Sequence, residues 1–280
     1  LLALITDVPN DIDVHHSLGW WWFFLPFSLL VWGGVMWVER QLEPLEQEPH
    51  SFGWFSRYSW LNICQLLVMT IALLFISNND RLFHERMKME HLMKEKQYEK
   101  ALEVGRKSLQ TDSSLTMLRI ACLNETGQLG SDLFNYPLVG GSEAMMPNGT
   151  SVKAMMWKFP GWMNKPSAWM VKHHLKYKIP VDYQLCALLL DRKIDDFVRQ
   201  VGKYYNIESG KLPTHYKEAL VLYCHLRSHP IFEYHENVMD ADYQDYQTME
   251  AKYGNAVERQ AALRDTYGNT YWYYYQYGSK

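Results

Sequence analysis

The sequence predicts an all-α protein in which two transmembrane helices precede a helical-repeat domain of the α-solenoid class. Three observations lead to this prediction. Two long windows near the start contain no ionisable side chain, and the rest of the chain is made of charged, amphipathic segments. Some of these segments recur at close to the period of helix–turn–helix repeats, which is about 34 residues.

The composition averages these different parts. The 28 Lys and Arg against 31 Asp and Glu give a net charge of −3, which argues against a broad nucleic-acid surface. The mean hydropathy of −0.31 is that of an ordinary soluble protein. Aromatic residues, however, make up 15% of the chain, with 11 Trp and 19 Tyr. The distribution of apolar residues therefore matters more than their average.

The uncharged windows are long enough to cross a bilayer. The first, 17–38, reads SLGWWWFFLPFSLLVWGGVMWV, and the second occupies residues 60–77. A membrane span needs about 20 predominantly apolar residues, and Trp favours the membrane interface at its ends. We therefore expect a membrane region over 1–79 with these two spans, and the lipid bilayer as a partner. A pair of buried core helices is the alternative.

The positive charges predict the orientation. Arg40 and Arg57 lie between the windows, and no Lys or Arg precedes the first one. The positive-inside rule then places the connecting loop in the cytoplasm and the C-terminal domain in the periplasm of a bacterial inner-membrane protein. The start, Leu-Leu-Ala-Leu-Ile, looks like the end of a preceding span, so we expect the chain to be the C-terminal part of a longer polytopic protein.

Residues 80–280 form the predicted helical-repeat domain. Tyr98, Ala101 and Leu102 have helical apolar spacing, and Gln128-Leu129 follows Gln97-Tyr98 by 31 residues. Ile194 follows Tyr98 by 96 residues, which is about three periods. Gly127 is a helix stop signal. Coincidence among generic amphipathic helices is the alternative explanation.

One run of this domain resembles a known family. The run extends from Asp112 to Phe134, reads DSSLTMLRIACLNETGQLGSDLF, and is followed by Gly140-Gly-Ser-Glu-Ala and Met146-Pro. It is similar to an uncharacterised family of bacterial polytopic membrane proteins with several N-terminal spans and a tetratricopeptide-like helical domain. The resemblance covers about the last 200 residues and implies a fold and a location, but no activity.

An irregular segment, about 136–169, interrupts the predicted helices. It contains four Pro and is rich in Met and Trp, so we expect it to be ordered rather than disordered. Adaptable Met beside rigid Trp suits a partner contact. A packed insertion and a membrane-surface contact are the alternatives. The candidate binding residues here are Met155, Trp157, Trp162 and Trp169.

The C-terminus is a second aromatic segment. Six of the seven residues from Tyr271 to Tyr277 are aromatic. If exposed, they would form an association patch, and we select Trp272 and Tyr274 as candidate binding residues. Strand pairing, a sugar-stacking surface and a tail packed into the solenoid all remain open, and a packed tail is the commonest arrangement of so apolar an end.

No motif for catalysis, metal or cofactor binding is complete. His225 and His229 have i, i+4 spacing without further ligands, and the aspartates at 240, 242 and 245 lack the pattern of a calcium loop. Asp11 and Asp13 fit a solvated acidic loop better than a cation site. The cysteines at 64, 122, 186 and 224 lack CxxC spacing. We therefore expect neither metal nor cofactor.

These features favour a membrane-anchored scaffold or assembly protein. Helical arrays offer extended concave surfaces to partner proteins or peptides, here on the extracytoplasmic side. The alternative is the C-terminal part of a membrane enzyme acting on envelope glycan or lipid-linked substrates. In that case Asp11 and Asp13 would face the membrane and the repeats would be an accessory domain.

Overall fold

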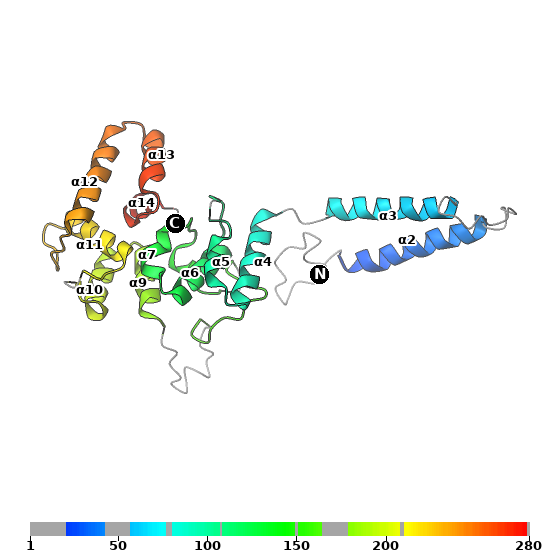
Figure 1. The fold of residues 1–280 in the computed structure, drawn as a ribbon, viewed down its shortest axis with the longest axis horizontal. Coiled ribbons are helices and arrows are strands. Elements are labelled where there is room, and N and C mark those ends of the chain that lie inside the picture. The colour runs from blue at the N-terminus through cyan, green and yellow to red at the C-terminus, as the bar shows by residue number, and fades with distance from the viewer. Residues whose placement is uncertain are drawn as a thin grey trace. The chain divides into compact units, whose positions relative to one another are not determined.

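A computed structural model describes residues 21–42, 57–76, 80–106, 108–148, 151–163, 179–207 and 210–278. Every regular element in these ranges is helical. The chain divides into two compact units, Leu1–Asp80 and Arg81–Lys280. Figure 1 shows the ribbon of each unit.

The first unit contains two long helices, α2 (Trp21–Leu42) and α3 (Arg57–Ile76). Their described side chains are mostly exposed, including Leu30 at 74% and Leu66 at 65%. On α3 the Thr70 hydroxyl donates to the carbonyl oxygen of Leu66, one turn earlier, at 2.8 Å. The unit therefore presents apolar side chains that no described residue covers.

These helices correct the prediction of transmembrane spans at 17–38 and 60–77. Among the residues that the structure describes, no helix is long and apolar enough to cross a membrane. The prediction treated both windows as predominantly apolar over the roughly 20 residues that a span needs. Uncharged Gly33, Gly34, Asn62 and Gln65 add little apolarity, and α2 runs on through Glu39 and Arg40.

The second unit is a chain of short helices that pack mainly on their neighbours in sequence (Figure 1). The helices and their bounds are α4 (Arg81–Lys94), α5 (Tyr98–Glu103), α6 (Ser113–Thr126), α7 (Leu129–Asp132), η2 (Leu133–Asn135), η3 (Gly141–Met145), α9 (Val181–Leu190), α10 (Ile194–Tyr204), α11 (Thr214–Leu226), α12 (Asn237–Lys252), α13 (Ala256–Tyr267) and α14 (Tyr271–Tyr277).

Three of the helix reversals in this unit share one backbone geometry. Lys96, Gly127 and Arg192 each adopt a positive φ, of 60°, 72° and 57°. In each case the N–H of the next residue donates to the carbonyl five residues earlier, at 2.9 Å. The N–H of the positive-φ residue itself donates three residues back, at 3.0 to 3.2 Å. This pair of hydrogen bonds is the Schellman motif, which satisfies the last carbonyls of a helix.

The recurring turn defines three helical hairpins. Lys96 joins α4 to α5, Gly127 joins α6 to α7, and Arg192 joins α9 to α10. The second and third turns lie 31 and 96 residues after the first. These are the spacings between the similar helical segments of the sequence. We call α4, α6 and α9, the helices that precede these turns, the leading helices.

Helix α6 is the centre of the core. Every residue from Ser114 to Leu123 is buried, although a helix at the surface would expose about half of them. Its first turn is capped by Asp112, whose side chain accepts from the N–H of Leu115 at 2.6 Å. Because α6 is covered on all sides, other parts of the chain must pack over the face that α4, α5 and α7 leave open.

The turn geometry predicts opposite changes in the free energy of unfolding for substitutions at Gly127 and at Lys96. Gly127→Ala places a Cβ on a positive-φ backbone and should lower the free energy of unfolding by about 1 kcal/mol. Exposed Lys96 already bears this strain, so Lys96→Gly should raise the free energy of unfolding by roughly 0.5 kcal/mol. Urea denaturation followed by circular dichroism measures both.

The matched control is Gly254→Ala, because a Cβ at Gly254 meets no atom within 4 Å and the residue has no positive φ. It should change stability by less than about 0.5 kcal/mol. Equal losses at Gly127 and Gly254 would contradict the assignment of a special turn at Gly127.

Candidate partner-binding surface

The irregular segment lies over the leading helices. We call residues 136–148 and 151–163 the strap. Met155 and Met156 are exposed on it, at 42% and 38%, whereas Val152 and Met163 are buried at 1% and 0%. Apart from the short helix η3, the described strap has no regular secondary structure. It is therefore an ordered loop that packs inward at some positions and exposes methionine at others.

The predicted contact residues are placed differently from one another. Met155 is exposed, whereas Trp157 and Trp162 are half-buried against the core. The Trp157 ring lies edge-to-face on Phe159 at 5.4 Å, and the Trp162 ring lies edge-to-face on Tyr183 of α9 at 4.7 Å. Trp169 lies outside the described residues. The two described tryptophans of the strap thus contribute as much to packing as to surface.

A buried carboxylate on α4 holds the middle of the strap. The Glu90 side chain is fully buried, and its Oε2 accepts from the backbone N–H groups of Met155 at 2.8 Å, Met156 at 2.5 Å and Trp157 at 3.3 Å. Successive backbone N–H groups that converge on one point form a concave anion site called a nest. Here the anion is a side chain of the same protein.

One charged group lies close to this carboxylate, and others lie farther along the same network. Arg86 Nε lies 3.9 Å from Glu90 Oε1, and Arg86 Nη1 lies 4.0 Å from Asp112 Oδ2. Arg119, fully buried on α6, donates to Thr111 Oγ1 at 3.0 Å and to the carbonyl of Gly105 at 3.3 Å. Burial lowers the pKa of Arg119. The opposite charges of this group offset part of the cost of removing Glu90 from water.

Polar side chains of all three leading helices bind strap backbone. On α6, the Ser114 hydroxyl donates to the Ser151 carbonyl and accepts from the Lys153 N–H, both at 3.1 Å. On α9, the Tyr183 hydroxyl donates to the Met145 carbonyl at 2.7 Å. Asp191, which follows α9, accepts from the Ser142 N–H at 3.1 Å. The strap is therefore held through its main chain at several points along its length.

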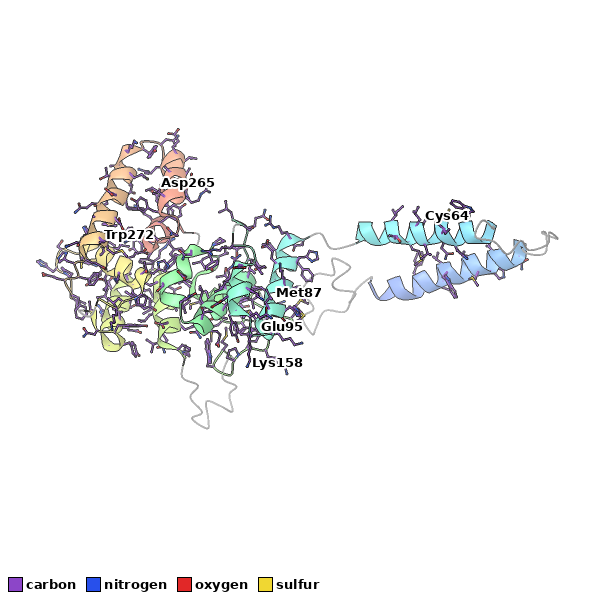
Figure 2. All side chains as sticks on the ribbon, in the orientation of Figure 1. Cys64, Met87, Glu95, Lys158, Asp265 and Trp272 are labelled. Carbon is purple, nitrogen blue, oxygen red and sulfur yellow. The ribbon has the colours of Figure 1, made fainter. Side chains whose placement is uncertain are left out.

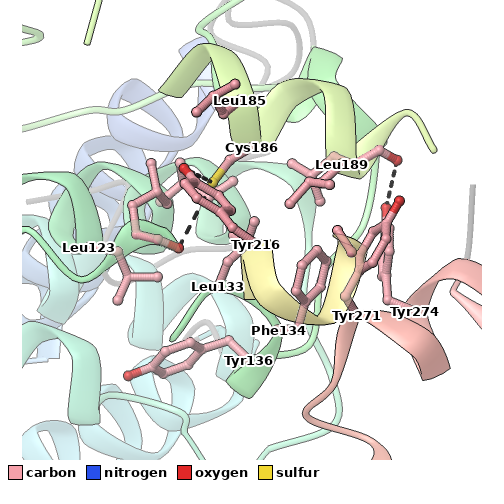
Figure 3. Packing of buried hydrophobic residues seen from close by; sticks show 14 of the residues in the cluster. Leu123, Leu133, Phe134, Tyr136, Leu185, Cys186, Leu189, Tyr216, Tyr271 and Tyr274 are labelled. Atoms are coloured by element: carbon pink, nitrogen blue, oxygen red, sulfur yellow. Dashed lines mark hydrogen bonds between the residues drawn. The ribbon is translucent and has the colours of Figure 1, made fainter. Parts of the chain in front are cut away.

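The C-terminal aromatic segment is packed into the core as helix α14. Trp272 is 2% exposed and Tyr274 is 8% exposed, so neither of these predicted contact residues has its ring on the surface. The Trp272 indole donates to the Glu218 carbonyl at 2.8 Å, and the Tyr274 hydroxyl donates to the Leu190 carbonyl at 3.0 Å. Figure 3 shows Tyr271 and Tyr274 beside Phe134. Of the open arrangements for this tail, the structure has the packed one.

A buried His–Glu pair anchors α14. Glu218 Oε2 accepts from the Tyr271 N–H at 2.7 Å and lies 2.9 Å from His215 Nδ1. His215 Nε2 accepts from the Phe134 N–H at 3.2 Å, so the ring proton must be on Nδ1, which donates to Glu218. A general base needs a free ring nitrogen facing its substrate. Because both nitrogens of His215 are used by the protein, this pair is structural.

A partly buried cluster of polar side chains joins α9 and α11 to Tyr205, the residue that follows α10. Asp182 Oδ1 accepts from the hydroxyls of Tyr205 at 2.5 Å and Tyr216 at 2.9 Å, and Cys186 Sγ lies 3.6 Å from the Tyr216 hydroxyl (Figure 3). Burial raises the pKa of both tyrosine hydroxyls above the ordinary value. It also raises the pKa of the Cys186 thiol, to about 12. The protonated forms keep these groups as hydrogen-bond donors, and the sequence offered no signal for the cluster.

The remaining candidate ligands do not converge. Within the described ranges, no group of three or more His, Cys, Asp or Glu side chains forms a metal site. His225 Nδ1 lies 2.9 Å from the Val221 carbonyl, and its ring lies 4.6 Å from Tyr243. The four cysteines are free thiols. Asp11 and Asp13 lie outside the described residues.

The anchoring of α14 predicts a stability effect at Glu218. Glu218→Ala leaves the buried Tyr271 N–H and His215 Nδ1–H without an acceptor. The free energy of unfolding should fall by about 2–4 kcal/mol, since each unpaired buried group costs about 1–3 kcal/mol. Urea denaturation measures the loss. Glu233→Ala, at an exposed carboxylate, is the control, and a similar loss there would contradict the anchoring role.

The burial of the thiols predicts their reactivity. Cys64 is exposed on α3 (Figure 2), whereas Cys122 and Cys186 are buried and burial raises the pKa of both thiols. The thiolate is the reactive form, so at pH 8 iodoacetamide should label Cys64 rapidly and the other two only after denaturation. Peptide mass spectrometry reads out each site. Labelling of Cys186 as fast as Cys64 in the native protein would refute the described packing.

Comparison with known proteins adds a family but no activity. No curated protein and no solved structure matches the chain significantly. A family model described as a family of unknown function (DUF6057) matches residues 11–160 and 163–278, and so spans both the helices of the first unit and the array with its strap. The chain therefore belongs to this family of unknown function, DUF6057.

Proposed function

We propose that this chain is a helical-repeat scaffold that binds a partner protein. The observation that supports the proposal best is the recurrence of one hairpin turn at Lys96, Gly127 and Arg192. Repetition of a hairpin builds an extended surface rather than a single catalytic pocket, and such surfaces are used to bind proteins and peptides. The period and the hairpins also support a tetratricopeptide-like classification of the array, which we include in the proposal.

The exposed methionines of the strap support a contact surface in this unit. Met155 and Met156 stand at the surface directly beside the buried clamp on Glu90. Methionine is flexible and polarisable, so it adapts to the shape of a partner, while a fixed backbone lowers the entropy cost of binding. Exposed Met on a clamped backbone combines both properties.

The first unit supports association with an apolar partner. Exposed apolar side chains such as Leu30 and Leu66 mark a surface that binds protein or lipid. We propose that the scaffold works at the bacterial inner membrane on its extracytoplasmic side, by association of this surface. Recovery of the intact protein in the membrane fraction, and its release by detergent but not by high salt, is the expected outcome of cell fractionation. Recovery in the soluble fraction would contradict this location.

Site-specific photo-crosslinking tests the scaffold function. A photoreactive residue replaces Met156 in the full chain, expressed in its own cells, and should give one protein adduct that mass spectrometry identifies. The same residue at Val257, which is 74% exposed on α13, is the matched control and should give none. Met155→Asp should reduce the adduct at least about tenfold, because a charge at an apolar contact costs more than about 1.4 kcal/mol.

Two outcomes would contradict the scaffold function. One is the absence of any specific adduct at position 156, and the other is an adduct that forms equally at position 257. Met155→Asp should leave the thermal midpoint unchanged, since its side chain is exposed, so a lost adduct then reports binding rather than unfolding.

A further inference from the structure

The hydrogen bonds between the leading helices and the strap share one property. The groups on the leading helices are side chains: Glu90 on α4, Ser114 and Thr116 on α6, and Tyr183 on α9. Asp191, which follows α9, and Arg119 on α6 also hydrogen-bond to the strap through their side chains. In every one of these bonds the strap contributes a backbone N–H or carbonyl. The hydrogen bonds thus hold the strap by its main chain, as a surface holds an extended peptide, while the buried side chains of Val152 and Met163 add packing.

The strap also crosses successive repeats in the same way. Glu90, Ser114 and Tyr183 belong to three different hairpins but each to the helix that precedes the turn. Equivalent helices of stacked repeats line one continuous face of an array, and that face is where such arrays bind extended ligands. The strap bridges these helices, since its short helix η3 packs on both α6 and α9 and its middle binds Glu90 of α4.

The clamp at Glu90 is an unusual way to hold a permanent part of a core. Its Oε1 is buried without a hydrogen-bond partner among the described residues, as are Nε and Nη2 of Arg86 beside it. Each unpaired buried polar atom lowers stability. An apolar contact would fix a loop more strongly at lower cost. A buried carboxylate that accepts three backbone N–H groups can bind any extended segment of suitable backbone geometry. This part of the recognition does not depend on the side chains of the segment.

We propose that the strap occupies, in cis, a peptide-binding face on the leading helices α4, α6 and α9, and that the ligand of this face is an extended peptide of a partner protein, held through its backbone by Glu90, Ser114 and Tyr183. This rests on the proposed scaffold function and names both the surface and the kind of partner. The tethered strap competes with the ligand at an effective concentration of about 1 mM, so the face is closed until the strap is lifted.

The exposed methionines suggest where the exchange begins. Met155 and Met156 carry the backbone N–H groups that bind Glu90, while their side chains point to the surface. A partner that binds these side chains and shifts them also weakens the hydrogen bonds from the same two residues to Glu90. Binding at the strap and opening of the face beneath it are thereby linked through the same two residues.

A peptide-binding experiment tests the proposal. The probe is a fluorescein-labelled peptide with the sequence of residues 152–163, VKAMMWKFPGWM. The strap is released in the full chain by Val152→Asp with Met163→Asp, because neither buried position can hold an unpaired carboxylate. Fluorescence anisotropy should show the probe binding this release variant about 100-fold more tightly than the wild type. Val257→Asp, the same change at an exposed position, should behave as the wild type.

A second substitution locates the binding. Adding Glu90→Ala to the release variant should weaken probe binding at least about tenfold, since charge-assisted hydrogen bonds to the backbone are lost. A folded release variant that binds no probe, or that binds it as weakly as the wild type, would overturn the proposal. Probe binding that Glu90→Ala leaves unchanged would overturn it as well.

Hydrogen exchange keeps the proposal testable if the release variant fails to fold. In the wild type, the amides of Met155–Trp157 should exchange through a local opening, at least about tenfold faster than the amides of Leu118 and Ile120 in α6. Exchange of both sets only by global unfolding would overturn the proposal. Failure is also distinguishable from failure of the scaffold function. A Met156 adduct without probe binding refutes only the proposal that the strap occupies a peptide-binding face. The absence of a Met156 adduct contradicts the scaffold function itself.

Discussion

The helix reversal with a positive φ is the constraint on which the second unit depends. At Lys96, Gly127 and Arg192 the chain leaves a helix through a left-handed residue and turns back at once, because two hydrogen bonds close over the last carbonyls. This fixes each following helix against the one before it. The buried faces of successive hairpins then lie next to one another and form one core, with α6 at its centre.

Two buried carboxylates attach the parts that the hairpins do not include. Glu90 binds the strap and Glu218 binds α14, and both accept backbone N–H groups from segments distant in sequence. Their settings differ in one respect. Glu218 and its partner His215 are satisfied by Tyr271 and Phe134, whereas Glu90 retains a buried oxygen without a hydrogen bond. The Glu218 carboxylate is therefore the more completely paired of the two, although the Tyr271 hydroxyl is also buried without a hydrogen-bond partner among the described residues.

Local patterns predicted some of this and tertiary contacts decided the rest. Gly127 and the 31-residue spacing were visible in the sequence, because a glycine after an apolar helix marks a turn. Lys96 carried no such signal, since a long charged side chain is not typical of a left-handed position. Buried Glu90 and Glu218 were missed for a similar reason, as carboxylates are expected at the surface. The two predicted spans are wrong, because no helix among the described residues is long and apolar enough to cross a membrane.

The aromatic segments illustrate why composition alone could not assign the contact surface. Trp272 and Tyr274 of the tail are buried because their polar atoms find carbonyl acceptors at Glu218 and Leu190, which brings both rings into the core without unpaired groups. Met155 and Met156 have no polar atom that requires pairing, so their backbones bind Glu90 while their side chains remain at the surface. Hydrogen bonds thus accompany the burial of Trp272 and Tyr274, whereas the clamp on the strap backbone left the methionines exposed. The positions of the backbone donors therefore decide which side chains of the strap remain exposed. These positions follow from the fold and not from the abundance of any residue type.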